Sequence, residues 1–280
     1  MSDSSLDAAP LPDARRLSFN QATAERASLR EVVDACARHG VPSVGIWRNK
    51  LHETGIDETA RLVRDAGVSV SSLCRGGMFP ALTEAERLEH IDDNRRAIDE
   101  AARIGAEVLV LVCGPARDRD IAGARRMVRD GIAAIESYAK ERGIRLGIEP
   151  LHPAFAAERS CITMLREARL LAEQFDENVV GVVVDVYHVW WDPDRTDEIS
   201  RLGARIVGYH VNDWLVPSRD VLMGRGMMGD GVIELRAIRG EVERAGYAGP
   251  IEVEIFNDRI WSMPVDELVQ FTRDRFIACA

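Results

Sequence analysis

The feature that most constrains the fold is the alternation of short apolar runs with longer amphipathic segments from Arg16 to the end of the chain. A run such as residues 179–184, rich in valine, is too short for a helix and is typical of a buried strand. Segments such as residues 121–142 repeat apolar residues at helical spacing. A strand followed by a helix, repeated along the chain, implies parallel strands joined by right-handed crossovers.

Eight such units are predicted between residues 16 and 280. The expected strands are residues 17–20, 43–47, 68–74, 107–113, 145–148, 179–184, 206–210 and 251–255. The expected helices are residues 24–38, 55–66, 83–104, 121–142, 161–175, 195–202, 232–245 and 264–278. This count predicts one α/β domain, a (β/α)8 TIM barrel spanning residues 16–280, after a disordered tail of residues 1–15. A doubly wound open sheet is the alternative, although no Gly-rich phosphate loop follows the first strand.

Composition narrows the possible partners. The 36 basic and 46 acidic residues give a formal charge of −10 without any Lys/Arg run, which disfavours nucleic acid and anionic membranes. No apolar run approaches the length needed to cross a bilayer, and residues 1–15 lack the apolar segment of a signal peptide. The five scattered cysteines form no C-x-x-C pair, which predicts reduced thiols in a cytoplasmic protein. A small-molecule partner is therefore expected.

The last four predicted strands each end in a residue that can bind a metal ion: Glu149, Asp185, His210 and Glu254. In a barrel of this type the carboxyl ends of all strands meet on one face, where active sites are built. Three carboxylates and one imidazole suit Mn²⁺, Mg²⁺ or Co²⁺, and Zn²⁺ is also compatible with them. Each residue also has a purely structural alternative, as a strand cap or as a core histidine. Cys74 and Cys113 end other strands, and we interpret them as packing residues.

Four segments in this half of the chain resemble the sugar phosphate isomerase/epimerase superfamily, the xylose isomerase-like barrels. They are residues 146–150 (LGIEP), 184–188 (VDVYH), 208–213 (GYHVND) and 249–254 (GPIEVE). That group includes ketose 3-epimerases, hydroxypyruvate isomerase and inosose dehydratase, with endonuclease IV as a distant relative. The resemblance covers all of the chain after the tail.

The resemblance implies that Glu149, Asp185, His210 and Glu254 hold one divalent metal ion. It also implies that Glu149 and Glu254 are the catalytic acid/base pair, and that the protein is a homodimer or homotetramer. Two further residues are implied to contact a small sugar substrate. His188 would bind its oxygens, and an arginine after the seventh strand would contact it; we favour Arg225 over Arg219 because a Gly-supported loop follows Arg225.

These assignments predict a metal-dependent sugar isomerase or epimerase, acting on a ketose or sugar acid. One glutamate would remove the proton α to the carbonyl, the metal ion would stabilise the resulting enediolate, and the second glutamate would return the proton. A lyase of the inosose dehydratase type remains open, since the same base could start a β-elimination. A non-catalytic sugar-binding barrel also remains open. DNA repair is disfavoured because the third and fourth strands end without histidine.

Several assignments stay open at the sequence level. Glu252 and Glu254 share one face of the last strand by its two-residue period, so periodicity cannot choose the ligand; position and the family pattern favour Glu254. Trp47 and Arg75, at the ends of the second and third strands, are expected either to line a sugar pocket or to pack at the rim. Asp213 is expected either to orient His210 or to cap the next segment.

Overall fold

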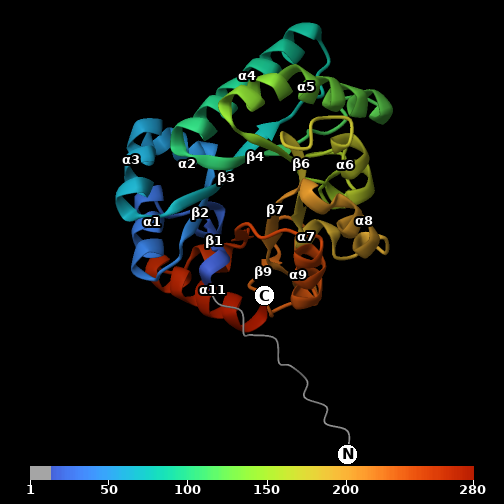
Figure 1. Cartoon of the computed structure of the whole chain (residues 1–280). Coiled ribbons are helices and arrows are strands. Elements are labelled where there is room, and N and C mark those ends of the chain that lie inside the picture. The colour runs from blue at the N-terminus through green and yellow to red at the C-terminus, as the bar shows by residue number, and fades with distance from the viewer. Residues whose placement is uncertain (1–13) are drawn as a thin grey trace, which may run out of the picture.

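Eight parallel strands close into a barrel in the computed structural model, which describes residues 14–280 (Figure 1). The hydrogen-bonded order around the barrel is β1-β10-β7-β6-β5-β4-β3-β2, which confirms the predicted (β/α)8 fold. The strands are β1 Leu17–Asn20, β2 Ser43–Trp47, β3 Ser69–Gly77, β4 Ala106–Val112, β5 Arg145–Ile148, β6 Val180–Asp185, β7 Ile206–Val211 and β10 Ile251–Val253.

Helices form a ring outside the barrel (Figure 1). The ring consists of α1 Leu29–Arg38, α3 Ile56–Ala66, α4 Glu84–Ile104, α5 Ile121–Arg142, α6 Leu165–Ala172, α8 Arg195–Leu202, α9 Leu235–Arg244 and α11 Val265–Cys279. None of the helices in the described part of the chain is both long enough and apolar enough to cross a membrane. All five cysteines are free, as predicted, and four of them are buried.

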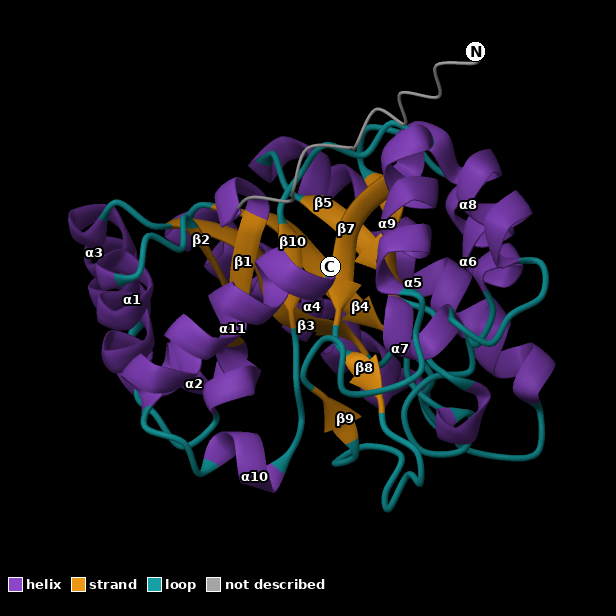
Figure 2. Ribbon diagram, turned by 90° about the horizontal axis from the view of Figure 1, so that it is seen from below, coloured by secondary structure: helices purple, strands orange, loops and turns teal. Residues whose placement is uncertain are grey.

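Several short elements follow the carboxyl ends of the strands and lie together at one end of the barrel, the lower end in Figure 2. Sequence patterns did not predict them, because each is too short to show a period. They are α2 Arg48–Thr54, η3 Pro153–Phe155, α7 Val186–Val189, α10 Asp258–Trp261 and an antiparallel ribbon of β8 Asp213–Trp214 with β9 Arg225–Gly226. These elements enclose the end of the barrel where the candidate site residues lie.

Two predicted helices are shorter than expected at their amino ends. The helix predicted from residue 24 begins at Leu29, because the Ser28 side chain accepts the Glu31 N–H and the Glu31 carboxylate accepts the Ser28 N–H. Residues Gln21–Ala24 instead form a separate 3-10 helix, η2. The helix predicted from residue 161 begins at Leu165. Of the predicted tail, residues 1–13 lie outside the described residues, while Ala14 and Arg15 belong to the 3-10 helix η1 Ala14–Arg16.

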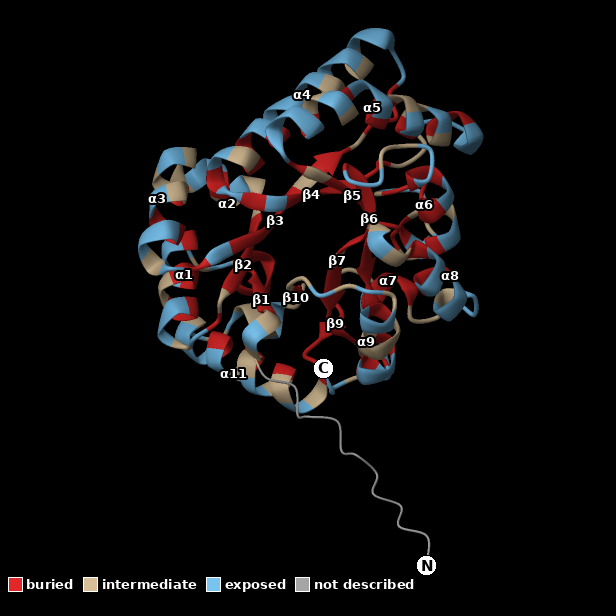
Figure 3. Ribbon diagram, in the orientation of Figure 1, coloured by how far each residue is buried: buried red, intermediate tan, exposed pale blue. Residues whose placement is uncertain are grey.

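The strands are largely buried (Figure 3), and two of the three buried apolar clusters lie on either side of them. The larger one lies between the barrel and its helices, and strand β6, buried along its whole length, contributes to it. The smaller one fills the barrel interior and includes Cys74, Val110 and Val183. Polar residues occupy the rest of the barrel interior and are continuous with the candidate site.

Candidate active site

Three of the predicted metal ligands converge at neighbouring strand ends. Glu149 follows β5, Asp185 ends β6, and His210 lies in β7 directly opposite Asp185 in the strand register. All three are buried, and one ligand atom of each lies within 4.8 Å of the others. Adjacent parallel strands bring these residues together although they are far apart in sequence.

Two ligand atoms in this triad, Glu149 Oε1 and His210 Nδ1, are buried, and their one recorded polar contact is the ion pair that they form with each other at 3.3 Å. Buried polar atoms are rarely left unpaired in native proteins. Burial alone would lower the pKa of His210, but the carboxylates of Glu252, Glu149 and Glu254 raise it to about 10. A cation is therefore strongly favoured at this point, and the donor set of two carboxylates and an imidazole fits a divalent metal ion.

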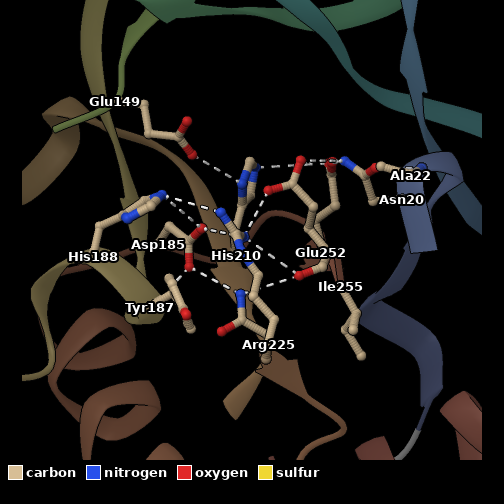
Figure 4. A network of polar contacts seen from close by, with 12 residues as sticks. Asn20, Ala22, Glu149, Asp185, Tyr187, His188, His210, Arg225, Glu252 and Ile255 are labelled. Carbon is tan, nitrogen blue, oxygen red and sulfur yellow. Dashed lines mark hydrogen bonds and ion pairs between the residues drawn. The ribbon is translucent and has the colours of Figure 1, made fainter. Parts of the chain in front are cut away.

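The fourth predicted ligand, Glu254, lies outside this triad and is linked to it through Arg225, which lies beside Asp185 in Figure 4. The Arg225 Nη1 group donates to Glu254 Oε2 at 2.9 Å and to Asp185 Oδ2 at 3.0 Å. The guanidinium also lies over the Tyr187 and Phe256 rings, 4.7 and 4.9 Å from their centroids. Burial raises the pKa of Glu254 to about 7, although Arg225 opposes this shift. The carboxyl of Glu254 thus has a pKa suited to proton transfer near neutral pH.

Arg225 is carried by the β8–β9 ribbon, and Asp213 organises the loop that follows it. The Asp213 carboxylate accepts the backbone N–H groups of Gly229, Gly231 and Ile233 at 2.9–3.0 Å. Of the two roles expected for Asp213, the structure therefore favours supporting the next segment over orienting His210. The other candidate arginine, Arg219, is exposed in the loop between the two strands of the ribbon.

His188 lies in α7, next to Asp185 and Arg225. Its Nδ1 accepts the backbone N–H of His152 at 3.1 Å, so the neutral ring carries its proton on Nε2. That nitrogen lies 3.6 Å from Asp185 Oδ2. Burial lowers the pKa of His188 to about 3, so the ring is neutral at ordinary pH. A neutral imidazole in this position can exchange hydrogen bonds with a hydroxyl group of a ligand.

Glu252 lies deeper in the barrel than Glu254, on the same face of the last strand, as its two-residue spacing predicts. Its carboxylate accepts hydrogen bonds from Asn20 Nδ2, Ser71 Oγ and Ser72 Oγ at 2.5–3.1 Å. The Asn20 amide also donates to Glu254 Oε1 at 3.2 Å, which connects the two glutamates. Sequence reasoning missed Asn20. The available signal was its position at the end of the first strand, which is comparable with the positions of Glu149 and Asp185 on their strands.

Trp47 and Arg75 line a cavity of about 920 Å³ at the mouth of the barrel. The Trp47 indole donates to Asn20 Oδ1 at 3.1 Å and packs edge-on against Phe256, with ring centroids 5.6 Å apart. Through Asn20 the cavity wall is connected to Glu252 and Glu254. The cavity is large enough for a molecule of sugar size.

Comparisons with known proteins agree with this fold. The chain is 46% identical to a protein of Sinorhizobium meliloti 1021 of known crystal structure, with a TM-score of 0.93 over 96% of this chain and 99% of that one. It is 26% identical, over 85% of its length, to a 3-dehydroshikimate dehydratase of Pseudomonas putida, and it spans 37% of the length of that enzyme. It is 22% identical to a 3-dehydro-D-guloside 4-epimerase of Escherichia coli, over 73% of this chain and 79% of the epimerase.

The sequence profile of one family matches residues 33–275, which include every predicted metal ligand. The family is described as the xylose isomerase-like TIM barrel, which agrees with the resemblance in the four strand-end segments. By this match and by its fold, the chain belongs to the xylose isomerase-like TIM barrel family.

Proposed function

We propose that this protein is a divalent-metal-dependent isomerase or epimerase that moves a proton on the carbon next to the carbonyl of a small sugar. The observation that carries the proposal is the convergence of three buried ligands, Glu149, Asp185 and His210, in which Glu149 Oε1 and His210 Nδ1 contact only each other. Mn²⁺, Mg²⁺ or Co²⁺ suits this oxygen-rich set, and Zn²⁺ is also compatible. Glu149, Asp185 and His210 would hold the ion, with Glu254 as the fourth ligand once Arg225 releases it.

The bound ion would act as a Lewis acid that polarises the substrate carbonyl and stabilises negative charge on its oxygen. Glu149 and Glu254 would exchange the proton. They follow β5 and β10, with β6 and β7 between them in the barrel, so they approach a ligand from two sides. Opposed carboxylates allow a proton to be removed from one face of a carbon atom and returned to the other.

The remaining residues would hold the substrate in place. The neutral ring of His188 and the Arg225 guanidinium supply polar groups beside Asp185, and both are buried. Trp47 supplies an apolar face to the cavity. Because the site is enclosed by β8–β9 and α7, water would be largely excluded from a bound sugar, which strengthens these interactions.

Elimination of water is the second candidate reaction. The match to a 3-dehydroshikimate dehydratase supports it, since that reaction also begins with removal of a proton near a carbonyl group. Both reactions require the same base and the same ion, and they differ in the step after proton removal. In epimerisation or isomerisation a carbon atom regains a proton, whereas in elimination a β-hydroxyl group leaves as water. Product mass separates the two, because elimination lowers it by one water molecule.

The test is hydrogen exchange in D₂O, followed by NMR and mass spectrometry. Purified protein is stripped of metal, reloaded with Mn²⁺, and incubated with a panel of ketoses, keto-acids of sugars and 3-dehydroshikimate. We expect metal-dependent exchange at the carbon beside the carbonyl, and loss of this exchange in Glu149→Gln and Glu254→Gln. The control is Glu89→Gln, which removes an exposed carboxylate on α4. Full exchange in a folded Glu149→Gln variant would remove Glu149 from the mechanism.

A further inference from the structure

Two arginines near the mouth of the barrel have no acidic partner. They are Arg75, near the end of β3, and Arg159, in the loop between η3 and α6. Within residues 14–280 neither guanidinium forms an ion pair or a hydrogen bond, and the one recorded contact is that of Arg159 with the Phe155 ring, at 5.9 Å. Both side chains are half-buried. The chain has 46 acidic and 36 basic residues, so acidic groups outnumber basic ones, and a half-buried arginine without an acidic partner is notable for that reason.

The backbone brings the two arginines to the same side of the mouth, on either side of the end of β4. After Arg75 the chain is attached to β4, because the Met78 N–H donates to the Val112 carbonyl at 2.8 Å. On the other side, the Gly114 N–H donates to the carbonyl of Arg159 itself at 3.1 Å. The segment after Arg75, the end of β4 and the segment that contains Arg159 therefore lie side by side in that order.

Electrostatic effects agree with this placement. Burial lowers the pKa of Arg159, and repulsion from Arg225 and Arg75 lowers it further, while attraction to Glu254 opposes the shift. Arg159 thus lies close enough to both Arg75 and Arg225 to be repelled by them. Arg225 is neutralised by Asp185 and Glu254, whereas Arg75 and Arg159 are not.

Nearby carboxylates are already engaged by other groups. In the site, Glu149 faces His210, and Glu252 accepts hydrogen bonds from an asparagine and two serines. In the cavity that Arg75 lines, Asp93 pairs with Arg48, and Glu25 is attracted by Lys50. None of these carboxylates forms an ion pair with Arg75 or Arg159, and the positive charge of the two arginines is available to a ligand.

We propose that the substrate is a sugar acid whose carboxylate binds to Arg75 and Arg159 while its ketone end faces Glu149 and Glu254. This inference rests on the proposed function, since it places the reacting end of the substrate at the candidate metal centre. A guanidinium matches a carboxylate in shape and can form two parallel hydrogen bonds with it. Phosphate sites in such barrels instead use backbone N–H groups after the seventh and eighth strands, on the other side of the mouth.

The test compares ketoses that differ only at C6. D-fructose, D-fructuronate and D-fructose 6-phosphate carry a hydroxymethyl group, a carboxylate and a phosphate there, and D-tagatose with D-tagaturonate forms a second pair. Binding to the Mn²⁺-loaded protein is measured by calorimetry, and turnover by exchange in D₂O. We expect at least one acid to bind roughly tenfold or more tightly than its neutral partner.

Variants then assign the preference to the two arginines. Arg75→Gln and Arg159→Gln should each weaken binding of the acid by roughly ten- to a hundredfold, and leave binding of the neutral ketose within about twofold. Arg75→Lys should restore part of the loss, because a charge remains but the two-pronged geometry does not. Arg166→Gln, which removes an exposed and unpaired arginine on α6, should change neither affinity.

Three results would overturn the inference. One is equal affinity for the acids and the neutral ketoses, or no binding of either acid. Another is tighter binding of the phosphate ester than of the acid. The third is an equal loss of affinity for acid and neutral ligands in Arg75→Gln, which would indicate that Arg75 does not recognise the carboxylate. Failure of the proposed function gives a different pattern, in which the acid binds through both arginines but no metal-dependent exchange follows.

Discussion

Glu252 Oε2 lies 3.9 Å from Nε2 of His210, while Nδ1 of the same ring faces Glu149. The imidazole is therefore placed between two carboxylates, one toward the candidate metal centre and one toward the barrel interior. A carboxylate behind a ligating histidine fixes the orientation of the ring and increases its basicity. On this basis we propose a positioning role for Glu252 rather than a role as ligand.

We expect Glu252→Gln to lower the affinity for Mn²⁺ by about 10- to 100-fold, because the amide cannot attract the imidazole as a carboxylate does. Calorimetric titration of the metal-free protein measures this affinity directly, and circular dichroism checks that the variant is folded. Glu89→Gln, exposed on α4, serves as the matched control and should bind Mn²⁺ like the wild type. An unchanged affinity in folded Glu252→Gln would show that Glu252 does not act on His210.

Gly45 provides the space that Glu252 occupies. In the strand register Gly45 lies between Asn20 and Ser72, both of which donate to Glu252. A Cβ atom on Gly45 would come within 2.1 Å of Glu252 Oε1. The Glu252 carboxylate is held by hydrogen bonds and cannot move aside without breaking them. The site therefore requires a residue without a side chain at position 45.

Gly45→Ala is therefore expected to destabilise the fold by about 1–3 kcal/mol and to weaken Mn²⁺ binding as well. Urea unfolding and calorimetry measure the two effects. The matched control is Gly240→Ala in α9, where the added Cβ would meet only the end of the flexible Arg244 side chain, at 3.1 Å. There alanine should be neutral or stabilise the helix by up to about 1 kcal/mol. If both substitutions had the same effect, the space at Gly45 would not be specific to Glu252.

The sequence was sufficient to predict the barrel, because each strand is a short buried run and each helix has a regular apolar face. It also indicated which strand ends carry Glu149, Asp185 and His210. It could not predict the contacts of Glu252, since these depend on the closure of β1 against β10 and on the register of β2 and β3. The partners of Arg225 were equally hidden, because the β8–β9 ribbon is too short to leave a periodic pattern.

Thiol reactivity tests the burial of the cysteines. Burial raises the pKa of Cys36 to about 12 and that of Cys161 to about 11, and it raises the pKa of Cys74 and Cys113 well above the usual value. A raised pKa means that the thiol, rather than the reactive thiolate, is present at pH 8. Cys279 is the one cysteine that is not fully buried.

We therefore expect one thiol to react quickly with a disulfide reagent at pH 8 in the native protein, and all five cysteines of the chain to react after unfolding in guanidinium. Cys279→Ser should remove the fast phase and leave the number of slow thiols unchanged. Rapid reaction of two or more thiols in the native protein would contradict the buried environment of Cys74, inside β3, or of Cys113, directly after β4.

Removal of divalent ions should lower the thermal stability of the protein. A ligand that binds only the folded state at 100 times its Kd adds about 2.7 kcal/mol of stability, which for a chain of this size raises the Tm by about 5 °C or more. We expect Mn²⁺ added to chelator-treated protein to produce such a rise in a calorimetric scan. Glu149→Gln should lose most of it, because a neutral amide replaces one of the two carboxylates of the buried triad.

The control for this experiment is again Glu89→Gln, which should show the full rise in Tm. The comparison separates the candidate metal centre from weak binding of cations to a chain with a formal charge of −10, because such binding would stabilise every variant alike. A full rise in Glu149→Gln would place the ion elsewhere on the protein. Loss of the rise in Glu149→Gln alone would show that the stabilising ion binds where β5, β6 and β7 bring Glu149, Asp185 and His210 together, and the exchange experiment then tests whether that ion serves catalysis.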